Sequence, residues 1–306
     1  MTTGTSSPGA GGPITDTVVV HCPAKTNLEL RVGAARTEIG NRHPLRTLYC
    51  ALSLADSVRL TRRPEGSGVS LALQGPHLGG LSVSGPSAYR NHAVRALLAA
   101  AEAYGRLPDV AISITKRIPV GAGLGGGSAD AAGVLLGVNA LWQLHEPPAA
   151  WETIASGLGA DMPFCLHGGL AYGSGYGETI TLVEDSSEVA QHYRSLGLLG
   201  ETLIGAYRQQ LPTAEVYAAF DRLGSCPDDT NDLQRASLTL HPRSREAIDL
   251  ALGAGARHAF VSGSGPSVIA CVDGGGVADA VRQAWLEGGA VDWIHQAESP
   301  AWPYVE

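Results

Sequence analysis

Alternating and periodic apolar positions along the first part of the chain predict a mixture of strands and helices. Short runs of β-branched and apolar residues bounded by Gly, Pro and polar residues are typical of strands, and they occur at 17–20, 28–32, 57–61, 69–73 and 110–115. A polar interruption at 23–27 separates the first two runs. Residues 93–104 are rich in Ala and Leu at helical spacing, and Asn91 is placed to cap that helix.

The most regular pattern begins at Ser128. Apolar residues recur there at intervals of three and four, so the spacing predicts an amphipathic helix that ends near Leu144, before two prolines. A second helix is expected at 149–158, and glycine-punctuated β structure at 170–182.

The pattern divides the chain into two domains. A tail at 1–16, rich in Thr, Ser, Gly and Pro, is expected to be disordered because it lacks apolar residues to bury. An acidic and polar run at 184–188 marks a boundary between an N-terminal domain, 17–183, and a C-terminal domain, 184–306. In the second domain, helices and strands are expected to alternate: helices at 213–223, 244–253 and 276–287, and strands at 258–262, 267–272 and 291–295. The fold class is therefore α+β with two domains, and a ligand site is expected where they face each other.

Composition and charge narrow the class of protein. A length of 306 residues allows about two domains. Lys and Arg number 21 against 29 Asp and Glu, which argues against an extended nucleic-acid surface. No run reaches the ~18 apolar residues of a membrane span, and the start lacks the basic region of a signal peptide. The five widely spaced cysteines contain no C-x-x-C pair and indicate free thiols in a reducing cytoplasm.

A glycine-rich loop at 119–130 is the strongest candidate for chemistry, with the sequence Pro-Val-Gly-Ala-Gly-Leu-Gly-Gly-Gly-Ser-Ala-Asp. Glycines without Cβ atoms let main-chain N–H groups close on an anion, and a helix start adds unpaired donors and partial positive charge. A flexible surface turn is the alternative, but such a turn rarely needs five glycines in seven residues. The loop is therefore expected to bind phosphate.

The residue types in this loop favour a nucleoside triphosphate. A Walker A loop is excluded because Gly127 stands where that motif has lysine. The glycines also fit the dinucleotide pattern G-x-G-x-x-G, but the nearest acidic residue at a suitable distance, Glu146, lies beside prolines rather than at a strand end. Ser128 and Asp130 supply a hydroxyl and a carboxylate, which suit phosphate and Mg²⁺ better than NAD.

Three motifs in this order resemble those of the GHMP kinase superfamily, which contains homoserine kinase, mevalonate kinase and galactokinase. They are Pro23-Ala24-Lys25-Thr26-Asn27-Leu28, the loop from Pro119 to Ala129, and Val261-Ser262-Gly263-Ser264-Gly265-Pro266-Ser267. Within the superfamily the chain is most similar to the 4-diphosphocytidyl-2-C-methyl-D-erythritol kinases, through the segments Gly159–Phe164, Gly173–Glu178, Pro212–Tyr217 and Asn231–Leu233. The resemblance covers roughly residues 18–275. It implies an N-terminal domain like domain 2 of ribosomal protein S5 and a ferredoxin-like C-terminal domain.

The resemblance also implies an activity, namely ATP- and Mg²⁺-dependent phosphorylation of the 2-hydroxyl of 4-diphosphocytidyl-2-C-methyl-D-erythritol in the non-mevalonate isoprenoid pathway. Asp161 is the implied base for the alcohol proton, and Lys25 the cation that keeps it ionised. Without the resemblance, Asp161 would be interpreted as a cap of the next turn and Lys25 as a strand residue reaching for solvent. Asn27 is expected to orient the substrate hydroxyl or diphosphate.

One position departs from the family pattern. His43 fits the family's cytosine-binding histidine, with a solvated loop histidine as the alternative. The family has an aromatic residue before it that stacks on cytosine, whereas this chain has Arg42. A guanidinium also stacks on a flat ring, so cytidine recognition and a different substrate both stay open.

The remaining implied contacts come from the motifs themselves. ATP contacts are expected from Lys116, Pro119, Val120, Gly121, Ala122, Gly123, Leu124, Gly125, Gly126, Gly127, Ser128 and Ala129, with Ser128 also a candidate Mg²⁺ ligand. Substrate contacts are expected from Asn27, Arg42, His43, Thr213, Ser262, Gly263, Ser264 and Gly265. Lys116 and its neighbour Arg117 could equally be solvated charges at a strand end, and Thr213 could equally cap a helix.

Two other functions are alternatives to phosphorylation of the cytidyl substrate. The first is a kinase of the same superfamily acting on another small alcohol, such as a cyclitol, a sugar or another isoprenoid precursor. The second is a non-catalytic nucleotide-binding protein, against which the pair of Lys25 and Asp161 counts. In each case we expect a monomer or weak homodimer in the cytoplasm, with a small-molecule partner and neither nucleic acid nor membrane.

Overall fold

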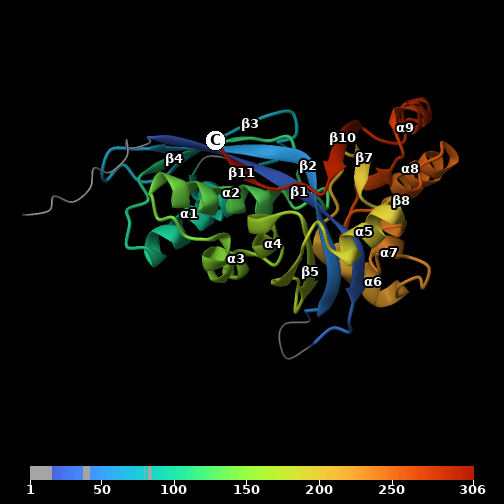
Figure 1. Ribbon diagram of the computed structural model, residues 1–306, viewed down its shortest axis with the longest axis horizontal. Coiled ribbons are helices and arrows are strands. Elements are labelled where there is room, and N and C mark those ends of the chain that lie inside the picture. The colour runs from blue at the N-terminus through green and yellow to red at the C-terminus, as the bar shows by residue number, and fades with distance from the viewer. Residues whose placement is uncertain (1–15, 37–41, 79, 82–84) are drawn as a thin grey trace, which may run out of the picture.

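The computed structural model describes residues 16–36, 42–78, 80–81 and 85–306, so most of the expected tail lies outside the described residues. Two β-sheets organise these residues (Figure 1). The larger sheet has the strand order β11-β1-β2-β4-β3, with the β5–β6 hairpin attached through β5 to β2. Its strands are β1 Thr17–Val32, β2 Leu45–Arg62, β3 Ser70–Gln74, β4 Val110–Thr115, β5 Leu170–Ser174, β6 Thr179–Val183 and β11 Tyr304–Val305.

Helices cover one face of the larger sheet, and a second group of helices surrounds the smaller one (Figure 1). The first group comprises η2 Gly85–Arg90, α1 His92–Ala103, α2 Gly126–Leu141, η3 Pro148–Trp151, α3 Glu152–Leu158 and α4 Met162–His167. The smaller sheet, ordered β10-β7-β9-β8, is built from β7 Gly200–Ala206, β8 His258–Val261, β9 Val268–Cys271 and β10 Trp293–Ser299. Its helices are α5 Glu188–Ser195, α6 Thr213–Leu223, α7 Gln234–Leu240, α8 Pro242–Gly253 and α9 Gly275–Gly288.

Strand β1 corrects the prediction of two separate strands. It runs without a break through the polar segment at 23–27. Its register against β2 shifts between Pro23 and Ala24 and again between Asn27 and Glu29. Such irregularities bend a strand and redirect its side chains. Residues 22–28 are buried on both faces of the strand, which is why the alternation of apolar and polar residues is lost there.

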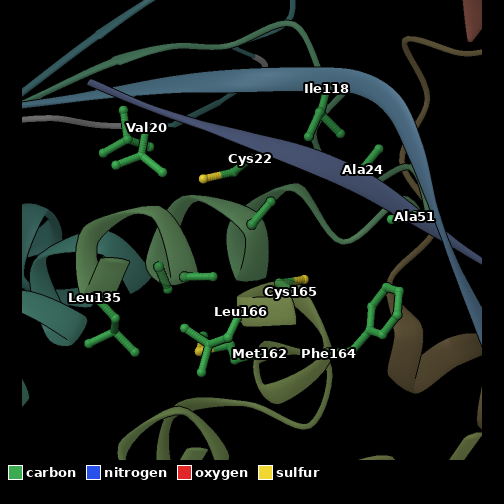
Figure 2. Close-up of a cluster of buried hydrophobic side chains, with 14 of the residues drawn as sticks. Val20, Cys22, Ala24, Ala51, Ile118, Leu135, Met162, Phe164, Cys165 and Leu166 are labelled. Atoms are coloured by element: carbon green, nitrogen blue, oxygen red, sulfur yellow. The ribbon is translucent and has the colours of Figure 1, made fainter. Parts of the chain in front are cut away.

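Helix α2 also differs from its prediction. It begins at Gly126, two residues before the expected Ser128, and ends at Leu141. Ten of its sixteen residues are buried and only Gly127 is exposed, so it is not the amphipathic helix that the spacing predicted. In Figure 2 this helix lies between β1, whose Cys22 points towards it, and α4, which contributes Met162 and Leu166. Sheet on one side and helices on the other leave α2 no solvent-facing stripe.

Most other predicted elements are confirmed. Strand β4 and helix α6 have the expected bounds, and the Asn91 side chain accepts a hydrogen bond of 2.9 Å from the Ala93 N–H at the start of α1. Helix α5 is mostly polar and α7 is short, so neither gave a periodic signal, and strand β7 was missed as well. The expected helix at 149–158 is divided between η3 and α3.

The two sheets lie on either side of the proposed boundary near residue 184, with one exception. Strand β11, at the end of the chain, returns to pair with β1, and Val305 lies opposite Val20. The domain limits of 17–183 and 184–306 therefore stay a prediction. Across the described residues the cysteines are free, as expected, and no helix is long and apolar enough to cross a membrane.

The close contact between α2 and the sheet yields a stability prediction. A Cβ atom at Gly133 would lie 2.5 Å from Cys22 Sγ and 2.9 Å from Val58 Cγ2. We expect Gly133→Ala to lower the melting temperature by about 2–4 °C, because overpacking of about 1–3 kcal/mol outweighs a helix-propensity gain of about 1 kcal/mol. Gly157→Ala, whose Cβ would meet nothing within 4 Å in helix α3, is the matched control and should stabilise. Thermal unfolding of both variants tests this, and a Gly133→Ala protein as stable as Gly157→Ala would contradict it.

Candidate active site

A cavity of about 650 Å³ brings the three predicted motifs together. Strand β1 contributes Lys25 and Asn27, the glycine loop contributes residues from Pro119 to Ser128, and the C-terminal motif contributes Gly263, Ser264 and Gly265. Asp161, at the start of α4, lines the same cavity. Residues nearly 240 positions apart in the sequence therefore meet at one site.

The glycines of the loop are required by its contacts. Gly121, Gly123 and Gly125 have φ values of 67°, 80° and 69°, a region that favours glycine. A Cβ atom on Gly123 would lie 2.2 Å from the carbonyl oxygen of Ser262, and one on Gly125 would lie 2.7 Å from Lys25 Cγ. The loop is thus pressed against the C-terminal motif on one side and against β1 on the other.

Lys25 links three parts of the cavity. Its main-chain N–H donates to the carbonyl of Leu124 at 2.9 Å. Its Nζ atom lies 3.0 Å from Asn27 Oδ1 and 3.3 Å from Asp161 Oδ2. Its side chain is only 7% exposed, whereas that of Asp161 is 32% exposed. The lysine therefore approaches the carboxylate from the protein side, and the carboxylate stays open to the cavity.

Asp161 immediately precedes helix α4, yet its side chain makes no capping hydrogen bond, which rules out the capping interpretation. Its other oxygen, Oδ1, accepts a hydrogen bond of 3.0 Å from the hydroxyl of Tyr49. Tyr49 is the fifth residue of strand β2 and belongs to no motif singled out in the sequence, so this contact was not predicted. Each carboxylate oxygen thus has its own partner.

Lys116 has a different environment from the one expected of a phosphate ligand. Its Nζ atom donates to Asp56 Oδ2, and to Asp130 Oδ2 at 2.7 Å, and the residue is 1% exposed. Both carboxylates raise the pKa of Lys116 despite its burial, and burial raises the pKa of Asp130. Asp56 also accepts hydrogen bonds from the N–H groups of Arg117 and Ile118. Lys116 lines the cavity, but its charge is balanced by two carboxylates.

Two other expected cations lie outside the cavity wall. The Arg117 guanidinium donates to Ser57 Oγ at 2.9 Å, and Arg117 does not line the cavity. The Arg42 guanidinium lies 4.1 Å from the ring centre of Tyr176, which does line it. His43 is also outside the wall. Its Nδ1 and Nε2 lie 2.9 Å from the Gly33 carbonyl oxygen and 3.4 Å from a carboxylate oxygen of Asp221.

The C-terminal motif is held in place by buried polar contacts. The hydroxyl of Ser262 donates to the carbonyl of Gly123 at 3.1 Å. The amide of Asn231, which is fully buried, donates to the carbonyls of Val261 and Gly263 at 2.9 and 2.7 Å. Thr213 is the first residue of α6, and its hydroxyl lies 3.3 Å from Ser264 Oγ at the cavity wall.

Several predicted contact residues are buried behind the wall, and others emerge only from the structure. Leu124, Ala129 and Ser262 do not line the cavity and instead support it. Residues that the sequence analysis did not propose as ligand contacts but that line the cavity are Leu30, Leu45, Tyr49, Leu81, Arg90, Asn91, His92, Gly159, Ala160, Tyr176, Leu211, Tyr217 and Leu233. Asn91 was noted only as a helix cap.

The buried lysine provides a test of its role. Lys116→Met would leave two carboxylates buried without a cation, so we expect a loss of about 3–5 kcal/mol in the free energy of unfolding. Arg257→Met removes an exposed pair with Asp273 and should cost less than about 1 kcal/mol. Denaturant unfolding measures both. Unchanged stability with weakened ATP binding in Lys116→Met would make Lys116 a phosphate ligand rather than a structural cation.

Comparisons with known proteins agree with this geometry. The profile for the GHMP kinases N terminal domain matches residues 91–169, and that for the GHMP kinases C terminal region matches residues 217–291. Among solved structures, a 4-(cytidine 5'-diphospho)-2C-methyl-D-erythritol kinase is 28% identical with a TM-score of 0.69, covering 92% of this chain and 99% of that one. The homoserine kinase from Cytophaga hutchinsonii, at 19% identity and a TM-score of 0.72 over 98% and 100% of the two chains, supports the fold alone.

Curated relatives are closer in sequence. The 4-diphosphocytidyl-2-C-methyl-D-erythritol kinase of Bifidobacterium adolescentis is 52% identical, covering 98% of this chain and 97% of the relative. The protein of the same name from Bifidobacterium longum subsp. infantis is 54% identical, covering 94% of this chain and 92% of the relative. The expected two-domain fold is thereby confirmed, and the chain belongs to the GHMP kinase family and, within it, to the 4-diphosphocytidyl-2-C-methyl-D-erythritol kinases.

Proposed function

We propose that the chain transfers the γ-phosphoryl group of ATP to the 2-hydroxyl of 4-diphosphocytidyl-2-C-methyl-D-erythritol, a step of the non-mevalonate isoprenoid pathway. The observation that carries the proposal is the position of Lys25, which contacts the glycine loop and the carboxylate of Asp161 at the wall of one cavity. Relatives that are more than half identical over nearly the whole chain bear the name of this kinase, which supports the substrate.

The glycine loop is proposed to bind the triphosphate. Three residues of positive φ turn the main chain around the cavity, and α2 begins directly after Gly125. The first N–H groups of a helix have no partners within it and carry partial positive charge, which favours an anion. The cavity volume of about 650 Å³ falls within the range of small-molecule sites.

Asp161 is proposed to accept the proton of the reacting alcohol. The alcohol oxygen forms a bond to the γ-phosphorus, the bond to the β–γ bridging oxygen breaks, ADP leaves, and the proton passes to the carboxylate. Lys25 stabilises both the carboxylate and negative charge that develops on the alcohol oxygen. The amide nitrogen of Asn27 donates to the Thr47 hydroxyl at 2.7 Å, and its amide oxygen accepts a hydrogen bond from Lys25 Nζ. Asn27 therefore restricts the position of the lysine ammonium group.

The residues around the loop fit a magnesium ion that arrives with the nucleotide. Mg²⁺ is usually held by one or two protein oxygens together with phosphates and water. Ser128 places a hydroxyl at the wall, and the buried Oδ1 atom of Asp130 has no hydrogen-bond partner in the part of the chain that the structure describes. The ion would neutralise charge on the phosphates, with Ser128 as the proposed ligand.

The substrate is proposed to enter from the side of Tyr176 and Tyr217, since both line the cavity and Tyr217 packs against His43 with ring centres 5.1 Å apart. Arg42 stacks on Tyr176 instead of supplying the family's aromatic ring. This pair favours a flat base as ligand, but a guanidinium held against Tyr176 at the cavity wall would also attract an anionic alcohol. A kinase for another small alcohol is therefore the second candidate. A monomeric or weakly dimeric state and a cytoplasmic location stay predictions.

Replacement of the proposed base tests the mechanism. We expect Asp161→Asn to lower kcat by about 10²–10⁴, because general-base catalysis contributes that factor, while the Kd for ATP changes less than about threefold. Release of ADP with the cytidyl substrate and isothermal titration with ATP measure the two quantities. Asp273→Asn, at an exposed ion pair, is the control. Turnover at the wild-type rate would remove Asp161 as the base.

Arg42 tests the choice of substrate. We expect Arg42→Ala to raise the KM for the cytidyl substrate about 3- to 30-fold, as loss of a stacking cation costs about 0.5–2 kcal/mol, with the KM for ATP unchanged. Arg42→Tyr, which restores the family's aromatic residue, should recover the affinity. A panel of cyclitols and sugars assayed in parallel distinguishes the candidates, since phosphorylation of one of them in preference to the cytidyl substrate would favour the second.

A further inference from the structure

Tyr49 brings a hydroxyl to the catalytic wall from inside the protein. The residue is 1% exposed, and its hydroxyl lies 3.0 Å from Asp161 Oδ1 and 3.4 Å from the carbonyl oxygen of Gly177. A tyrosine hydroxyl has one hydrogen to donate, and the closer, charged oxygen is the stronger acceptor. The hydroxyl therefore donates to the carboxylate.

The ring of Tyr49 is held beside Asp161 by close contacts with Phe164, Gly173 and Gly177. It stacks on Phe164 with ring centres 4.9 Å apart and an interplanar angle of 21°. A Cβ atom on Gly173 would lie 2.5 Å from Tyr49 Cε2, and one on Gly177 would lie 2.5 Å from the hydroxyl oxygen. Two glycines of the motif Gly173-x-Gly175-x-Gly177 therefore make room for this side chain, which gives that motif a physical role.

The two oxygens of Asp161 are held by different groups. Oδ2 faces Lys25 and Oδ1 faces Tyr49, from neighbouring strands β1 and β2. Two fixed partners restrict rotation of the carboxylate about its bond to Cβ. Each oxygen accepts more than one hydrogen bond, so the carboxylate keeps acceptor capacity towards the cavity.

We propose that Tyr49 is a positioning residue that fixes the orientation of the Asp161 carboxylate and stabilises its ionised form through a donated hydrogen bond. The proposal rests on the function of Asp161 as the base. A hydrogen bond to the charged form of an acid favours that form, so loss of the donor makes the carboxylate easier to protonate.

The tyrosines and the cysteine near this pair keep their protons at neutral pH. Burial and the neighbouring Asp161 raise the pKa of Tyr49 well above its ordinary value, so it stays a donor. Burial also raises the pKa of the Cys165 thiol on α4 and raises the pKa of Tyr217 on α6 to about 12. Lys25 faces the other oxygen from β1. Loss of the hydrogen bond to Asp161 is therefore tested on the acid side of the rate profile.

Tyr49→Phe tests the proposal because phenylalanine retains the stack on Phe164 and removes only the hydroxyl. The acid-side inflection of kcat is expected to move about one pH unit higher. Rates below the inflection then fall about tenfold, while the plateau at high pH changes less than about threefold. A lower plateau with an unmoved inflection would mean that Tyr49 is only structural and would overturn the proposal.

Tyr193→Phe is the matched control. The hydroxyl of Tyr193 also donates to a carboxylate, that of Glu29, but neither residue lines the cavity. Its profile should coincide with that of the wild type. A shift equal to that of Tyr49→Phe would show that loss of any such bond moves the inflection, and the proposal would fail.

A second replacement keeps the test decisive if Tyr49→Phe does not fold. Replacement of Tyr49 by 3-fluorotyrosine keeps the shape and makes the phenol a stronger donor, so the inflection should move to lower pH. A shift in the other direction would contradict the proposal.

Asp161→Asn separates the hypothesis that Asp161 is the base from the hypothesis that Tyr49 positions it. If it is inactive while both Tyr49 replacements leave the inflection in place, the base stands and the role of Tyr49 falls; if it turns over normally, the base itself is wrong.

Discussion

The rest of the site depends on the two ion pairs that the buried ammonium group of Lys116 forms with Asp56 and Asp130. It lies between Asp56 of β2 and Asp130 of α2, so one charge ties the sheet to the helix that follows the glycine loop. Asp56 also accepts the main-chain N–H groups that lead into that loop. Buried ion pairs are weak sources of net stability, but removal of one partner is costly. This cluster therefore fixes where the loop begins and where α2 starts, and those two points define the phosphate side of the cavity.

Glycine is used here for close contact as much as for flexibility. The loop touches Lys25 at Gly125 and the C-terminal motif at Gly123, and each contact leaves no space for a Cβ atom. Gly173 makes the same kind of room for Tyr49. At the site these glycines thus allow dense packing of several segments around one small volume, in which the Lys25 and Tyr49 side chains are held at defined distances from the Asp161 carboxylate.

The sequence predicted the motifs better than their surroundings. Lys25, Asp161 and the glycine loop were found because each breaks a local pattern or matches a family motif. Tyr49 could not be found, since an aromatic residue in an apolar strand is typical of a core, and its hydrogen bond depends on the tertiary position of α4. Lys116 was expected at a phosphate because it lies just before the glycine loop, with a solvated strand-end charge as the alternative. Neither expectation includes its two carboxylate partners, which come from positions 56 and 130. The continuity of β1 was missed because burial on both faces removes alternation.

The cavity also depends on contact between the N-terminal and C-terminal halves of the chain. The carbonyl of Gly123 accepts the hydroxyl of Ser262, and the amide of Asn231 holds the carbonyls on either side of that serine. The loop conformation is therefore supported by residues from the C-terminal half of the chain, whereas the carboxylate and its lysine belong to the N-terminal half. Phosphoryl transfer needs the γ-phosphorus and the alcohol oxygen in line. The C-terminal motif lies against both the loop and the Lys25 side chain, since a Cβ atom on Gly263 would be 3.3 Å from the Gly123 carbonyl oxygen and 3.3 Å from Lys25 Nζ. Contact between the halves therefore supports the nucleotide side and the base side of the cavity together.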